Sequence, residues 1–149
     1  MADQVALLQN GRILAAAAPR ELYSAPATAA VANSLGHVNV LMATLRGERA
    51  TCVLGEISLA EVSASARGLV LVRAENIDVR ETRAQGLVEA RVTQFDYFGH
   101  DSIAHVEVAG AEGGRPVEIV ARIVGDRILS VGQSVWLGTN GPGRTLPVA

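Results

Sequence analysis

The pattern of hydrophobic and polar positions changes near residue 36, and the part before it begins with two strand-like runs. These apolar runs, residues 5–9 and 12–16, flank Asn10 and Gly11. An Asn-Gly pair accepts the positive φ angles of a type I′ turn, which matches the twist of two antiparallel strands. The sequence therefore opens with a predicted β-hairpin.

Two short helices are predicted after this hairpin. Pro19 suits the first turn of a helix that runs to about Ser24, because an N–H at that position has no intrahelical partner. Pro26 and Thr28 begin a second short helix, which Gly36 can end in a left-handed conformation. The opening segment is thus a mixed α and β unit.

From Val38 onward the chain consists of short β-branched runs separated by glycine-bearing turns. No helix-sized segment separates them, so we expect antiparallel pairing in a small barrel or sandwich rather than a parallel sheet. The chain therefore divides into a mixed unit, residues 1–36, and an all-β domain, residues 37–149. The predicted strands have the sequences VNVLMATL, ATCVLG, GLVLVRAENIDV, GLVEARVTQF, SIAHVEV, VEIVARI and SVWLG.

Alternation assigns faces to two of these runs, which Gly113, Gly114 and Pro116 join into a predicted hairpin. In the first run, small and β-branched side chains share the inward face, those of Ala104, Val106 and Val108. The opposite face carries Ile103, His105 and Glu107. The second run places four apolar side chains inward, those of Val117, Ile119, Ala121 and Ile123.

The composition of the chain argues against several classes of protein. The 149 residues have a net charge of -2, and all 13 basic residues are arginines that form no stripe, which argues against a nucleic-acid partner. The single cysteine, Cys52, has no internal disulfide partner and reads as a small buried residue, consistent with a reducing cytoplasm. The longest apolar run is far below the roughly 18 residues of a membrane span, and Asp3 does not suit a signal peptide. We expect a cytoplasmic protein.

Candidate chemistry is sparse. A phosphate-binding loop of the G-x-x-x-x-G-K-[ST] type requires a lysine, and the sequence has none. SVGQS, residues 130–134, lies between apolar strands and reads as a turn, and GTNGPG, residues 138–143, reads as a C-terminal loop. No serine lies in a G-x-S-x-G elbow, so we assign no catalytic residue.

The histidines are His37, His100 and His105, and HDSIAH suggests a metal site formed by the last two with Asp101. Positions 100 and 105 of a strand face opposite sides, however, and a typical site needs three or four converging ligands. The simpler interpretation places His100 and Asp101 in a turn after Gly99, with His105 facing solvent beside Glu107. We therefore assign no metal and no cofactor site.

The order of several motifs resembles the C-terminal part of ABC-importer ATP-binding subunits. ADQVALLQNGRILAAAAPRELYSAPATAAVANSLG is similar to the segment that closes their nucleotide-binding domain. GHVNVL, LVLVRAENIDV and YFGHD resemble the accessory TOBE domain, a small OB-like antiparallel β-barrel. The ATP-binding and signature motifs of the family precede the first residue seen here.

This resemblance implies a regulatory, dimerising domain that is not an enzyme by itself. ATP and Mg would bind elsewhere in a full-length parent, which would work with membrane-spanning permease subunits at the inner face of the cell membrane. YFGHD is most similar to the ferric-iron, polyamine and thiamine branch, and we favour ferric iron. The alternative is a small oxyanion- or metal-sensing module, although the Ser-Ala-Arg-Asn opening of the related molbindin domains is not found.

Four positions depart from the family pattern. Ala18 replaces the threonine before the helix-starting proline, so a capping side chain worth about 1 kcal/mol is missing. Ala30 and Ser34 occupy positions that are often aromatic in the second helix, so we expect that helix to pack differently. Ala74 replaces the proline of RPEN, which should free Arg73 from an imposed extended conformation.

We also expect a homodimer, because apolar residues lie on the outward face of several predicted strands. Ile103, Val120 and Trp136 need either a second copy or cover from the N-terminal helices. The hairpin of residues 5–16 presents an unpaired edge, which we expect to be mobile or to pair with a neighbouring chain.

We predict that this chain neither binds nor hydrolyses ATP, because no lysine is present to neutralise the phosphates. Calorimetric titration with Mg-ATP and a phosphate-release assay should match the buffer blank. Micromolar affinity or turnover above that blank would contradict the prediction.

Overall fold

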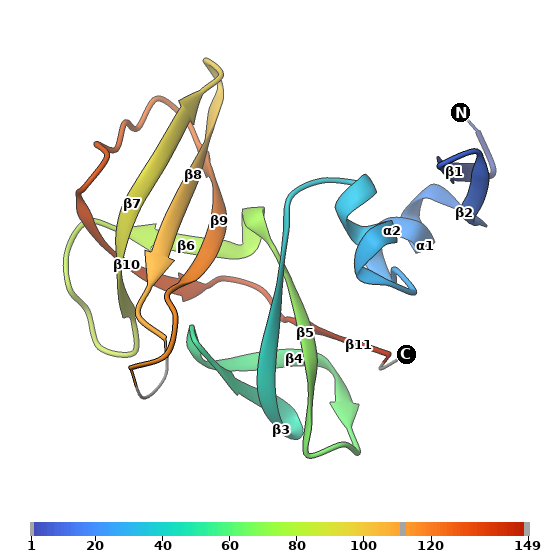
Figure 1. Cartoon of the computed structure of the whole chain (residues 1–149), viewed down its shortest axis with the longest axis horizontal. Coiled ribbons are helices and arrows are strands. Elements are labelled where there is room, and N and C mark those ends of the chain that lie inside the picture. Colours follow the sequence, from blue (N-terminus) through green and yellow to red (C-terminus); the bar gives the residue numbers. More distant parts are fainter. Residues whose placement is uncertain (1, 111–112, 148–149) are drawn as a thin grey trace.

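The computed structural model describes residues 2–110 and 113–147 (Figure 1). The first unit contains β1 (Val5–Gln9), β2 (Arg12–Ala17), α1 (Pro19–Ser24) and α2 (Ala29–Ser34). The second begins with β3 (Val38–Cys52), β4 (Gly55–Ser63), β5 (Arg67–Arg73), the short 3-10 helix η1 (Ala74–Asn76) and β6 (Ile77–Arg80). It ends with β7 (Val88–Tyr97), β8 (Asp101–Val108), β9 (Val117–Val124), β10 (Ser134–Thr139) and β11 (Arg144–Leu146). The fold is mainly β, as predicted.

The N-terminal unit confirms the predicted hairpin and helices. Asn10 and Gly11 have φ angles of 50° and 75°, which a type I′ turn requires. Ala18 gives α1 no side-chain cap, whereas the Thr28 hydroxyl accepts a hydrogen bond from the Val31 N–H at 3.2 Å. The hairpin and helices lie to one side of the β-domain in Figure 1.

Two antiparallel sheets form the β-domain. One has the strand order β6-β10-β7-β8-β9, and the other has the order β11-β5-β3-β4. β3 is a single long strand that joins two of the predicted runs, and its first half pairs with β5 while its second half pairs with β4. The sequence prediction missed β4 and β11. The predicted C-terminal loop is partly wrong, because β10 extends to Thr139 and β11 follows the loop.

Both sheets curl until their outer strands meet. β6 and β9 contact each other across the ends of the five-stranded sheet. In the smaller sheet the Ala60 N–H donates to the Gly143 carbonyl at 2.8 Å. The Glu61 carboxylate accepts from the Thr145 N–H at 3.0 Å and from the Arg144 guanidinium at 2.9 Å, so β4 satisfies the edge of β11. Curling therefore protects edges that a flat sheet would expose.

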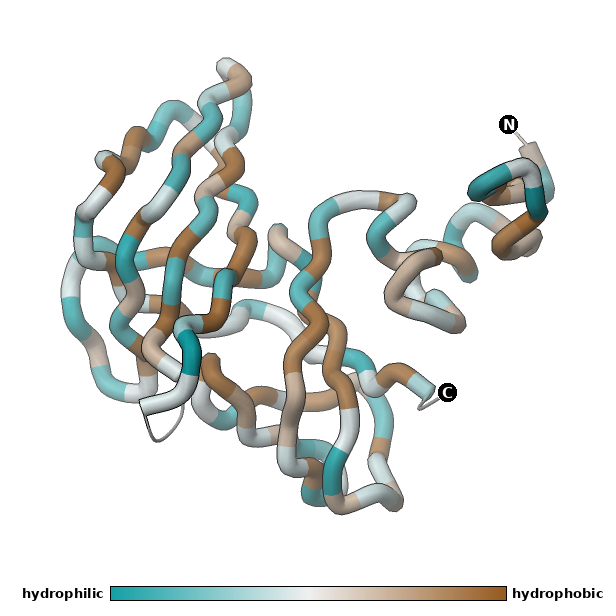
Figure 2. Tube along the Cα trace, in the orientation of Figure 1, coloured by the Kyte–Doolittle hydropathy of each residue, from teal (hydrophilic) through white to brown (hydrophobic). Residues whose placement is uncertain are grey.

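One continuous hydrophobic core fills the space between the sheets, and Figure 2 shows hydrophobic positions concentrated along β3 and β5. The predicted inward face of β8 is buried, with Ala104, Val106 and Val108 in this core, and so are Ile119, Ala121 and Ile123 of β9. Ile103 is not part of this core, in agreement with its predicted place on the opposite face of β8. It is only 7% exposed, because residues of the N-terminal segment and η1 lie around it, which is the cover that the sequence offered as the alternative to a second copy.

A separate small cluster attaches α2 to the outer face of the smaller sheet. Ala32 of α2 packs with Leu71 of β5 and Leu146 of β11.

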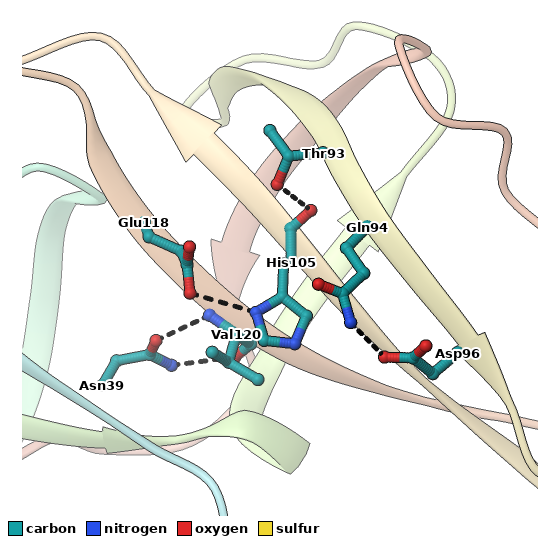
Figure 3. Close-up of polar contacts among 7 residues, drawn as sticks. All are labelled: Asn39, Thr93, Gln94, Asp96, His105, Glu118 and Val120. Carbon is teal, nitrogen blue, oxygen red and sulfur yellow. Dashed lines mark hydrogen bonds and ion pairs between the residues drawn. The ribbon is translucent and has the colours of Figure 1, made fainter.

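Asn39 of β3 joins the two sheets through its side chain (Figure 3). Its Oδ1 accepts from the Val120 N–H at 2.7 Å, and its Nδ2 donates to the Val120 carbonyl at 2.9 Å. Nδ2 also lies 3.3 Å from the Val72 carbonyl. Asn39 is 4% exposed, so this buried amide satisfies the outward-facing N–H and carbonyl of Val120 where the two sheets approach each other.

We predict that Asn39→Ala lowers the free energy of unfolding by about 2 kcal/mol, because the Val120 N–H and carbonyl lose the side-chain amide that binds them. Urea denaturation measures this change. Thr93→Val is the matched control, since the Thr93 hydroxyl bond to the His105 carbonyl is exposed. Its effect should stay within about 0.5 kcal/mol. Equal effects of the two substitutions would contradict the prediction.

Candidate functional site

Arg73, the last residue of β5, connects the β-domain to the N-terminal helices. Its side chain is buried, with the residue 6% exposed. The guanidinium donates to the Tyr23 carbonyl at 2.6 Å and to the Ala32 carbonyl at 3.3 Å. Its central carbon also lies 3.9 Å from the centroid of the Tyr23 ring, a cation–π contact. One arginine thus holds α1 and α2 against the domain.

Glu75 of η1 adds a second contact to the same tyrosine. The Tyr23 hydroxyl donates to the Glu75 carboxylate. This hydrogen bond, together with burial, raises the pKa of Tyr23, because ionised Tyr23 would lose the bond and face a like charge. Tyr23 therefore remains a neutral donor at physiological pH.

A pocket of about 400 Å³ lies beside this contact, between the N-terminal segment and the ends of β8 and β9. Its lining combines Tyr23, His37 and Phe98 with the ion pair of Asp101 and Arg122. The Arg122 Nε donates to the Asp101 Oδ2 at 2.5 Å. The pocket thus places aromatic side chains next to an ion pair that is already formed within the chain.

Asp101 is not the simple turn residue that the sequence predicted. It is the first residue of β8 and is 8% exposed, because it pairs with Arg122 across the sheet and with the exposed His100 at 3.3 Å. A buried carboxylate needs such a partner, and Arg122 provides it.

His105 lies far along β8 from His100 and faces the solvent side beside Glu118 of β9 (Figure 3). Its Nδ1 is 3.0 Å from the Glu118 Oε1. Within residues 2–110 and 113–147, no three His, Cys, Asp or Glu side chains converge in a way that would hold a metal ion. The HDSIAH histidines therefore do not meet at one site.

Cys52, at the end of β3, is partly buried, and its thiol has a raised pKa because burial disfavours the thiolate. This agrees with a packing role. Residues 130–134 form the predicted turn, closed by a 3.0 Å hydrogen bond from the Gln133 N–H to the Ser130 carbonyl, and β10 begins at Ser134.

Sequence reasoning missed the roles of Arg73 and Asn39, since each contacts residues far away in the chain. Ala74 removes the extended bias that a proline would impose on Arg73, but Arg73 does not use this freedom. Arg73 stays extended at φ -69° and ψ 148°, because its buried guanidinium and the 3.1 Å bond from the Ala74 N–H to the His37 carbonyl fix the backbone. The sequence did contain one signal of this contact, because Arg73 is a single arginine at the end of an apolar strand.

We predict that Arg73→Met loosens α1 and α2 while leaving the β-domain folded. Loss of two charge-assisted hydrogen bonds should raise hydrogen exchange at the Leu22 and Ala32 amides by about tenfold or more. Exchange at Ile119 should not change. Arg80→Met is the control, because Arg80 forms an exposed pair with Asp78. Unchanged exchange at both helices would contradict the prediction.

Neither α1 nor α2, the α-helices of the described chain, has the length and apolar character needed to cross a bilayer. Residues 70–141 match the TOBE domain. The chain is 33% identical to an Fe(3+) ions import ATP-binding protein, FbpC, of Pseudomonas fluorescens over 99% of its length, covering 42% of that protein. It is 30% identical to FbpC 1 of Rhodococcus jostii, covering 98% of this chain and 42% of the relative.

A spermidine/putrescine import ATP-binding protein, PotA, of Mesorhizobium japonicum is 31% identical over 75% of this chain and 33% of its own length. Among solved structures, the cytoplasmic molybdate-binding protein ModG superposes with a TM-score of 0.53 at 13% identity. The match covers 73% of this chain and 96% of ModG, and it supports the OB-like fold alone. The chain spans less than half the length of these importer relatives. It belongs to the TOBE-domain family and corresponds to the C-terminal portion of the ATP-binding subunit of an ABC importer.

Proposed function

We propose that this chain is a non-catalytic regulatory and dimerising portion of the ATP-binding subunit of a bacterial ABC importer. The observation that carries the proposal is the contact of Arg73 with α1 and α2. This contact attaches the segment that resembles the end of the nucleotide-binding domain to the TOBE barrel. Small movements of α1 and α2 would therefore be transmitted to the barrel. The parent would bind ATP and Mg upstream of this segment, at the inner face of the membrane and in contact with permease subunits.

The relatives named for Fe(3+) import support ferric iron as the solute of the parent transporter. The solute itself would be chosen by the membrane subunits and their receptor. The barrel acts by binding a second copy of itself. This dimer holds two nucleotide-binding domains near each other, which raises their effective concentration between cycles of ATP-driven closure.

The dimer would use an exposed apolar patch at the tip of the five-stranded sheet, which we define as Tyr97, Phe98 and Val124. Their exposed fractions are 51%, 61% and 77%. The Phe98 N–H bonds the Asp101 carbonyl, and Asp101 pairs with Val124 across the sheet, so the three residues are neighbours. Exposed apolar patches of this kind mark interaction surfaces, and a two-fold axis lets one patch meet its own copy. This patch replaces Ile103 of the sequence-based hypothesis; Val120 and Trp136 are half-buried.

We predict that the chain elutes as a dimer, at twice 15.5 kDa, in light scattering coupled to size exclusion at tens of micromolar. Phe98→Glu should return it to the monomer mass, because a charge at the centre of an apolar interface costs several kcal/mol. Val62→Glu, at an exposed apolar position on β4, should leave the dimer intact. A monomer mass for the unaltered chain would contradict the prediction.

The second candidate function is a sensor of an oxyanion or metal ion, favoured by the shared fold with a molybdate-binding protein and by Arg122 beside the 400 Å³ pocket. Calorimetric titration with molybdate, sulfate, ferric and zinc ions separates the two candidates. Saturable binding that Arg122→Met abolishes supports the sensor. Absence of heat with all four ions supports the association role.

A further inference from the structure

A large apolar groove lies between the two sheets, on the side where β3 approaches β9. Its volume is about 830 Å³. Residues from both sheets line it, among them Val40, Met42, Thr44, Cys52, Val88 and Val117. Arg67 is the only charged side chain among the lining residues that the structure describes.

One wall of this groove is a strand edge without a partner in the described chain. β5 pairs with β3 over residues 38–44, and β4 takes the opposite edge only from Gly47 onward. The Leu45 N–H donates to the Ala66 carbonyl on the β5 side at 2.8 Å. Backbone groups alternate between the two edges of a strand, so those of Val40, Met42 and Thr44 point away from β5. Three residues thus offer donors and acceptors to the groove.

The facing wall is the outer edge of β9, and it shows how such an edge is satisfied. At one end of the groove, Asn39 binds both backbone groups of Val120 with a side-chain amide, as a neighbouring strand would. By the same alternation the backbone of Glu118 faces outward, and Val117 lines the groove. The side-chain amide of Asn39 therefore takes the place that one peptide group of an added strand would take between the edges of β3 and β9.

We propose that the groove binds an extended peptide segment of a partner protein by strand addition to β3. The backbone of an extended segment matches the alternating donors and acceptors of all three residues, Val40, Met42 and Thr44, which is the basis of β-augmentation. The apolar lining selects small apolar side chains. Arg67 of β5 lies opposite Thr44 of β3. A segment that runs antiparallel to β3 begins beside Thr44, so its first residue carries a carboxylate that complements Arg67. This site is separate from the tip patch and does not depend on the proposed function.

The test uses a synthetic peptide, acetyl-DVAVTVG-amide, and the whole chain. Hydrogen exchange measured by NMR should show fast exchange at Val40, Met42 and Thr44 in the free protein, and slow exchange when the peptide is added. Leu41, Ala43 and Leu45 should be protected in both states. Calorimetry should give saturable binding. N-methylation of alternate residues along one edge of the peptide should weaken binding about tenfold or more, because it removes backbone donors.

A second experiment tests the proposed contact between Arg67 and the aspartate of the peptide. Replacing the peptide aspartate by lysine should weaken binding about two- to fivefold, as expected for an exposed ion pair. Arg67→Glu should reverse this preference, and unchanged exchange at Ile119 confirms that the variant is folded. Equal affinity of both peptides for both proteins would overturn the carboxylate assignment.

Three results would overturn the proposal itself. The first is protection of Val40, Met42 and Thr44 in the free monomer, which means that the chain already covers this edge. The second is protection that rises with protein concentration, which identifies a second copy as the occupant. The third is failure of the aspartate peptide to bind while the edge amides exchange freely.

Discussion

The β-domain depends on satisfying backbone hydrogen bonds where two curled sheets approach each other. Asn39 supplies an amide that binds the Val120 N–H and carbonyl at 2.7 and 2.9 Å, in a position that is almost fully buried. Without this amide, the Val120 N–H and carbonyl would be buried and unpaired, which costs free energy. The same two bonds connect β3 to β9 at one end of the groove, beside the edge of β3 to which we propose that a peptide adds.

A second buried polar residue attaches the N-terminal helices. α1 and α2 are each six residues long and would be unstable alone, since isolated helices of that length do not form in water. Arg73 binds two of their carbonyls and the face of Tyr23, and Ala32 allows a close approach to Leu71. The junction is therefore held by specific polar contacts of Arg73 and by the small apolar cluster around Ala32.

Local chemistry made much of this fold predictable. Asn10 and Gly11 define the hairpin, Pro19 starts α1, and alternation identifies the buried faces of β8 and β9. Long-range contacts were not predictable. Asn39 and Val120 are 81 residues apart, and nothing near either residue indicates the other. The roles of Arg73, Asp101 and Glu61 were missed for the same reason, since a polar residue in a strand does not reveal its partner.

The central claim is that the contact between Asn39 and Val120 makes the two sheets a single cooperative unit. Unfolding followed with one natural probe in each sheet tests this claim most directly. Trp136 in β10 reports on the five-stranded sheet by fluorescence, and Cys52 in β3 reports on the smaller sheet by its rate of thiol alkylation. Across a urea titration, the two transitions should share one midpoint and one slope. Separate midpoints in the unaltered chain would show that the sheets unfold independently and would contradict this account.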